Sequence, residues 1–111
     1  MSAQNYSLLG LCAIASAAVT ANTFVGWDNA TATAAGNAKG VARSDAALGA
    51  ALPVDIIGTA VVKATGAIAD GDALEVGANG TATVKSAGVT VARALQSVAD
   101  GELCEVLLIA N

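Results

Sequence analysis

The apolar residues of this chain come in short runs that are closed, again and again, by a glycine. Twelve glycines in 111 residues interrupt the sequence too often for long helices, although alanine favours helix. Between the glycines, runs rich in valine, threonine and isoleucine are typical of half-buried strands. The pattern predicts strands near residues 24–27, 31–34, 41–44, 52–57, 59–64, 73–76, 81–85, 89–95 and 104–109.

One ten-residue motif occurs twice in similar form. Residues 67–76 read Ala-Ile-Ala-Asp-Gly-Asp-Ala-Leu-Glu-Val, and residues 97–106 read Ser-Val-Ala-Asp-Gly-Glu-Leu-Cys-Glu-Val. Asp-Gly tolerates the positive φ of a tight turn, and the residues after it suit a strand, so the repeated unit is a turn followed by a strand. A shorter echo is Val-Ala-Arg at 41–43 and again at 91–93.

Two connections are defined further. Asn79-Gly80 between two alternating runs predicts a hairpin with a type I′ turn, which needs φ > 0 at both central residues. Residues 91–98 carry apolar side chains at helical spacing, so a helical turn competes there with a strand. The echo at 41–43 favours the strand.

The segment from Leu8 to Ala21 carries no charge. It is shorter than the ~20 apolar residues that span a bilayer. Ala15-Ser16-Ala17 resembles a signal-peptide cleavage site, but no lysine or arginine precedes the apolar run. We therefore expect an apolar first strand or a packing arm over residues 1–19, followed by a β domain over residues 20–111.

Composition predicts a thin core. Hydrophobic residues make up 55% of the chain, yet 28 of the 111 residues are alanine and only Tyr6, Phe24 and Trp27 are aromatic. Small side chains bury little area at ~25 cal/mol per Å². We therefore expect the protein to gain stability by oligomerising or by docking on a larger body.

Charge and chemistry exclude several classes of function. A net charge of −4 with five cations argues against nucleic acid and anionic membranes as partners. The chain has no histidine, the commonest general base and metal ligand, and no spaced cysteine framework, since Cys12 and Cys104 lie far apart. We expect no enzyme, no cofactor, no metal and no disulfide.

Two groups of residues leave alternatives open. The acids of the repeat, at 70, 72, 100 and 102, could act as carboxylate pairs or calcium ligands, but turn-forming side chains are the simpler interpretation. Phe24 and Trp27 could form a sugar-stacking platform, whereas scarce aromatics in a small β domain more often belong to a core or a subunit contact.

In order along the chain, the motifs resemble those of the small capsid cement, or head decoration, proteins of tailed bacteriophages. The likeness covers residues 20–109 and rests on Phe24-Val25-Gly26-Trp27-Asp28, Lys39-Gly40-Val41-Ala42, Asp55-Ile56-Ile57-Gly58-Thr59-Ala60, Ala67-Ile68-Ala69-Asp70-Gly71-Asp72, Ala78-Asn79-Gly80 and Glu102-Leu103-Cys104-Glu105-Val106-Leu107-Leu108. The resemblance implies an all-β, single-domain, β-tulip-like β-barrel of short strands and hairpins. It also implies a homotrimer at local three-fold positions on the outer face of the capsid, made in the host cytoplasm, that clamps neighbouring major capsid subunits.

The apolar N-terminal segment departs from the pattern of the family. We expect it to provide the capsid contact, through Leu8, Leu9, Leu11 and Ile14, and we expect docking to order the polar residues 2–7 and bury this stretch. The alternative function is a small β-barrel module that binds carbohydrate or a host surface.

Overall fold

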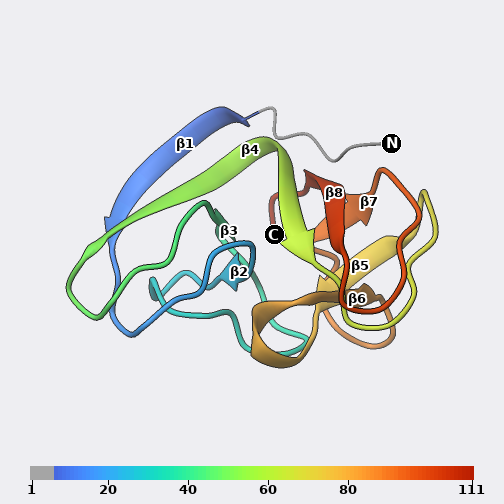
Figure 1. Cartoon of the computed structure of the whole chain (residues 1–111), viewed down its shortest axis with the longest axis horizontal. Coiled ribbons are helices and arrows are strands. Elements are labelled where there is room, and N and C mark those ends of the chain that lie inside the picture. The colour runs from blue at the N-terminus through green and yellow to red at the C-terminus, as the bar shows by residue number, and fades with distance from the viewer. Residues whose placement is uncertain (1–6) are drawn as a thin grey trace.

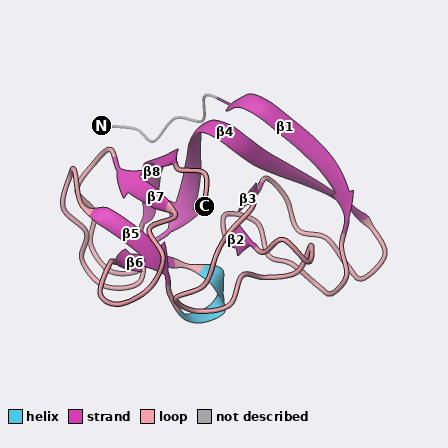
Figure 2. Cartoon of the chain, turned by 180° about the vertical axis from the view of Figure 1, so that it is seen from behind, coloured by secondary structure: helices cyan, strands magenta, loops and turns pink. Residues whose placement is uncertain are grey.

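Short strands and tight turns make up almost all of the computed structural model, which describes residues 7–111 (Figure 1). The strands are β1 (Ser7–Ile14), β2 (Phe24–Val25), β3 (Gly40–Ala42), β4 (Ala51–Lys63), β5 (Ala73–Val76), β6 (Ala82–Val84), β7 (Ala92–Ala94) and β8 (Leu103–Leu108). The helical element among these residues is a three-residue 3-10 turn at Ala78–Gly80, shown in cyan in Figure 2.

The strands form one sheet in the order β2-β3-β4-β8-β7-β5-β6, with β1 added to β4. A parallel bridge between Ala64 and Ala82 connects β6, which lies at one edge of this order, to the residue that follows β4. The sheet is therefore a nearly closed barrel, and the prediction of a small all-β barrel is confirmed.

Strand β4 is the longest element and was not predicted as one strand. The sequence divides it at Gly58, but the structure shows a continuous strand in which Gly58 takes φ +111°. A glycine tolerates this angle, so the strand bends there without ending. Its first half pairs with β1 and β3, and its second half pairs with β8.

Most of the other predicted elements are present but shorter. Residues 31–34 are an exception, because they contribute only the bridge from Thr31 to Val25 and no strand. Residues 92–94 form a strand, which decides against the helical alternative. The hairpin at Asn79-Gly80 is confirmed: φ is positive at both central residues, 57° and 76°, and the Thr81 N–H donates across them to the Ala78 carbonyl oxygen.

Four ten-residue segments of the chain share one backbone pattern: 15–24, 42–51, 64–73 and 94–103. Each begins with a buried alanine, has a bridging residue at its fifth position and takes positive φ at its eighth. The eighth residues are Asn22 (61°), Gly49 (83°), Gly71 (89°) and Gly101 (83°). The repeat found at 67–76 and 97–106 is thus confirmed as a turn followed by a strand, and the structure reveals two further copies.

The segments associate in two reciprocal pairs, 15–24 with 42–51 and 64–73 with 94–103. In the second pair Ile68 and Val98 exchange N–H···O bonds of 3.0 and 2.9 Å, Gly71 donates to Ala94 and Gly101 to Ala64. In the first pair the corresponding bonds join Val19 with Ala46, Asn22 with Ala42 and Gly49 with Ala15. The matching alanines are 42 and 94, so the Val-Ala-Arg echo is two residues out of register.

Each pair is associated with its own hydrophobic core. The first contains Ala15, Val19, Val25, Ala42, Ala46, Leu52 and Val54, and the second lies inside the barrel around Leu74, Val76, Val106 and Cys104. Because β4 leaves the first pair and enters the second, it supplies side chains to both cores, Leu52 and Val54 to one and Ala60 and Val62 to the other.

Glycine substitutions test this backbone. At Gly101 an added Cβ would meet nothing within 4 Å, so Ala should cost only the left-handed conformation, about 1–2 kcal/mol of unfolding free energy, and Asn should cost less. At Gly40 the same Cβ would lie 2.0 Å from the Asp55 carbonyl oxygen. We expect Gly40→Ala to cost more than Gly101→Ala in urea denaturation, and an equal loss for Ala and Asn at 101 would contradict the turn geometry.

Candidate functional site

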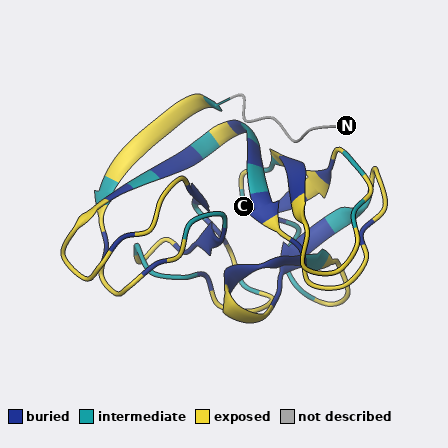
Figure 3. Cartoon of the chain, viewed as in Figure 1, coloured by how far each residue is buried: buried dark blue, intermediate teal, exposed yellow. Residues whose placement is uncertain are grey.

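Strand β1 is the most exposed apolar element of the described chain. Its largest side chains reach solvent, with exposed fractions of 80% for Leu8, 41% for Leu9, 49% for Leu11 and 61% for Ile14. The burial colouring shows the strand exposed along most of its length (Figure 3). The structure therefore brings the four predicted contact residues onto one strand that is not part of either core.

Only one edge of β1 is paired. Its register on β4 places Leu11 beside Val54 and Cys12 beside Pro53, so successive side chains point to opposite faces of the β1–β4 ribbon. No residue from Ser7 to Ile14 is charged. Edge strands of soluble proteins are usually protected by charges, proline or strong twist, and an uncharged apolar edge is suited to binding a partner.

The far end of the ribbon extends this surface. Ile14 pairs with Ala51, and the turn before β4 carries Leu48, which is 72% exposed. Leu48 occupies the turn position that Asp70 and Asp100 hold in the second pair of segments. Sequence reasoning missed Leu48, and the signal that could have found it is a leucine where the two Asp-Gly copies of the turn have aspartate.

An ion pair lies close to the ribbon. Arg43 Nε is 3.5 Å from Asp55 Oδ1, with the Asp55 side chain 2% exposed and the Arg43 side chain 51% exposed. These residues, with Asn22, Val61 and Leu103 among others, line a cleft of about 380 Å³. Asp55 belongs to β4, and Arg43 directly follows β3. The ion pair therefore links β4 to the segment that leaves the neighbouring strand β3.

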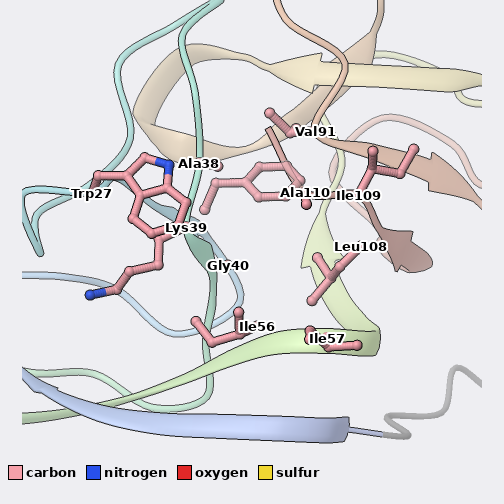
Figure 4. A pocket seen from close by; sticks show the side chains of 11 residues that line it. Trp27, Ala38, Lys39, Gly40, Ile56, Ile57, Val91, Leu108, Ile109 and Ala110 are labelled. Atoms are coloured by element: carbon pink, nitrogen blue, oxygen red, sulfur yellow. The ribbon is translucent and has the colours of Figure 1, made fainter.

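A second hollow lies at the bend of β4 and is mainly apolar (Figure 4). Its volume is about 290 Å³, and it is lined by Phe24, Trp27, Ala38, Lys39, Gly40, Ile56, Ile57, Val91, Leu108, Ile109 and Ala110. Phe24 is fully buried, which confirms the core interpretation for this ring, whereas Trp27 is 60% exposed and does not belong to a core. A platform made of both rings is therefore excluded.

The acids of the repeat stabilise turns. Asp72 accepts a hydrogen bond from the Ala69 N–H at 3.0 Å, and Glu102 accepts one from the Ala99 N–H at 2.8 Å. These two bonds are equivalent in the two copies of the turn. The turn-forming interpretation is thus confirmed for these residues.

Within residues 7–111, no three of the histidine, cysteine, aspartate and glutamate side chains are grouped as a metal site would require. The same residues contain no helix with the length and apolar character needed to cross a membrane. What this part of the chain does offer is the exposed ribbon and the hollows beside β4. A third hollow, of about 250 Å³, is lined by Leu11 and Cys12 of β1 and by Pro53 and Val54 of β4 among others.

These features define a small β-barrel that presents an uncharged apolar strand at its surface. The sequence model of the phage cement protein family matches residues 4–108, and the chain belongs to that family. It is thus a structural protein of the phage capsid. No curated protein matches the chain.

Among solved structures, the chain is similar to one described as "The crystal structure of head fiber gp8.5 N base in bacteriophage phi29". The TM-score is 0.76 and the sequence identity 21%, over 91% of this chain and 93% of that one. At this identity the likeness shows the fold alone.

The two cysteines differ in a way that can be measured. Both are free thiols, Cys12 exposed on β1 and Cys104 fully buried on β8, and burial raises the pKa of the Cys104 thiol. A raised pKa leaves less of the reactive thiolate at a given pH. In the native protein we expect iodoacetamide to modify Cys12 quickly and Cys104 slowly, as followed by mass spectrometry.

Cys12→Ser provides the matched control, because it leaves Cys104 as the sole thiol. Unfolding this variant in urea should restore rapid modification. Fast alkylation of Cys104 in the folded variant would mean that the Cys104 side chain does not face the interior of the barrel.

Proposed function

We propose that the protein is a cement protein that binds the outer face of the capsid and stabilises it by bridging neighbouring major capsid subunits. In this role it is a homotrimer at local three-fold positions, made in the host cytoplasm. The single observation that carries the proposal is an uncharged, apolar edge strand on a member of the phage cement protein family.

The proposed contact is the β1 surface, formed by Leu8, Leu9, Leu11 and Ile14. These side chains lie on β1, the edge strand of the ribbon, and none of them belongs to either core, so a partner can cover them without disturbing the barrel. Burial of apolar area is the main favourable term in stable protein association. Binding would in turn stabilise the folded protein by mass action.

The thin core agrees with this role. The buried residues include many alanines, and most of the large apolar side chains of β1 are left in solvent. A small domain of this kind gains stability from a permanent partner, and a shell subunit gains a second set of contacts. We expect residues 1–19 to act as the attachment arm and residues 20–111 as the barrel body.

A carbohydrate-binding or host-surface module remains the second candidate, and the exposed Trp27 is the observation that favours it. One exposed aromatic ring can stack on a sugar. The cement function has the stronger support, because it also accounts for β1.

Charged substitutions on β1 test the contact. Leu8→Asp/Leu9→Asp/Leu11→Asp should abolish attachment to capsids, because burying three unpaired carboxylates would cost several kcal/mol in all. The barrel should still fold, since none of the three side chains belongs to either core. The measurement is copurification of the variant with capsids that lack the wild-type protein, with circular dichroism as the check on folding.

A matched control is Val84→Asp/Leu95→Asp/Leu103→Asp, which charges three exposed apolar positions outside β1. This variant should attach normally. If the β1 variant copurifies at full occupancy, the contact lies elsewhere on the barrel.

Copy number separates the two candidate functions. A cement protein at local three-fold positions should be present in hundreds of copies per virion, whereas a receptor-binding module at a tail or spike is present in few. Quantitative mass spectrometry of purified virions, scaled to the major capsid protein, gives the ratio. A few copies per particle would overturn the cement proposal.

A further inference from the structure

The Arg43–Asp55 ion pair has no counterpart in the second unit of the internal repeat. The first unit contains β1, β2, β3 and the first half of β4, and the second contains the other half of β4 with β5, β7 and β8. Two contacts align them: Ala42 pairs with Val54 as Ala94 pairs with Val106, and the Arg43 N–H donates to the Pro53 carbonyl oxygen at 3.0 Å as the Leu95 N–H donates to that of Glu105 at 2.9 Å. Leu95 therefore holds the place of Arg43, and Leu107 holds that of Asp55.

The second unit shows that this backbone does not require an ion pair here, because it carries leucine at both positions. In the first unit the Asp55 side chain is only 2% exposed, so folding removes its carboxylate from water. Replacing a buried ion pair by apolar side chains is often neutral or stabilising. The charges at Arg43 and Asp55 therefore point to a role outside folding.

The Arg43 side chain lies where a partner that covers β1 would meet it. Arg43 lines both the cleft that it shares with Asp55 and the third hollow, which also contains Leu11 and Cys12 of β1. It is the one charged residue that lines this third hollow. Its side chain is 51% exposed although its Nε lies 3.5 Å from Asp55, so the guanidinium is accessible from solvent while it is paired.

We propose that Arg43 binds a carboxylate of the capsid subunit that covers β1, at the third hollow. This proposal rests on the proposed function, because it adds a second group to the same contact. The planar guanidinium presents N–H donors in a fork that matches a carboxylate, and Asp55 acts as a positioning residue that orients it. The apolar side chains of β1 supply buried area without direction, whereas a charged contact fixes the register of the partner and excludes wrong ones.

Arg43→Leu/Asp55→Leu tests the contact, because it copies the second unit and leaves no buried carboxylate without its partner. Its urea midpoint should be no lower than that of wild type. Its affinity for capsids that lack the wild-type protein, measured by cosedimentation, should fall about tenfold or more, because a charge-assisted contact is lost while the β1 side chains remain. Arg43→Lys should cause a smaller loss, since an ammonium keeps the charge without the fork.

Salt distinguishes a carboxylate from an uncharged acceptor. Raising NaCl from about 0.1 M to about 0.5 M should weaken the attachment of wild type more than that of the double variant, because salt screens a contact between charges. The matched control is Asp70→Leu/Lys85→Leu, which makes the same exchange at two exposed positions of the chain. The control should bind capsids as wild type does.

Wild-type affinity of the double variant, or an equal salt response of the two proteins, would overturn the proposal. So would a lower urea midpoint, because the ion pair would then serve folding. In each of these cases Leu8→Asp/Leu9→Asp/Leu11→Asp would still lose attachment if β1 is the capsid contact. Normal binding by that β1 variant, or no binding by wild type, would instead mean that the proposed function fails and the Arg43 contact with it.

Discussion

The reciprocal backbone hydrogen bonds between paired turn segments are the constraint on which the rest of the fold depends. In each pair, the residue at the fifth position exchanges two bonds with its counterpart, and the flanking bonds fix the strands before and after it. As a result β1 meets β4, β3 meets β2, the end of β4 meets β8 and β7 meets β5. One local rule, used twice, therefore generates most of the sheet.

Strand β4 joins the two uses of that rule into a single body. Its first half leaves one pair and its second half enters the other, with the bend at Gly58 between them. Gly40 packs against the same strand so closely that a side chain at this position would overlap the backbone of Asp55. Because both cores contain side chains of this thirteen-residue strand, β4 fixes their positions relative to each other. The β1–β4 ribbon is fixed in the same way, because β4 is one of its two strands.

The sequence predicts the barrel class and most of the strands, because turns with a positive φ are mostly occupied by glycine, which can be recognised in the sequence. It finds the second pair of segments, where Asp-Gly occurs twice, and misses the first. There Asn22 takes the place of glycine and Leu48 takes the place of aspartate, so the residues differ while the backbone is the same. Gly58 misleads in the other direction, because a glycine inside a bent strand has the same appearance as a glycine that ends one.

On β1, the lack of charge was enough to single out a candidate contact surface, but it did not identify the exposed apolar residues elsewhere. The four leucine and isoleucine residues named from the sequence are exposed as expected of a contact. The exposure of Trp27 and Leu48 could not be predicted, because it depends on which parts of the fold pack against the turns that carry them. Burial of an aromatic ring is set by tertiary neighbours, which a single sequence does not specify.

The separation of the paired segments also bears on how the chain reaches its native state. The bridges join Val19 to Ala46 and Ile68 to Val98, at separations of 27 and 30 residues. The entropic cost of closing a loop differs little between 27 and 30 residues, so loop length does not favour faster formation of either unit. Since β4 must be in place in both, formation of one unit orders half of a strand that the other needs. We therefore expect the two units to form in one cooperative transition, with neither favoured as the point of nucleation by loop length.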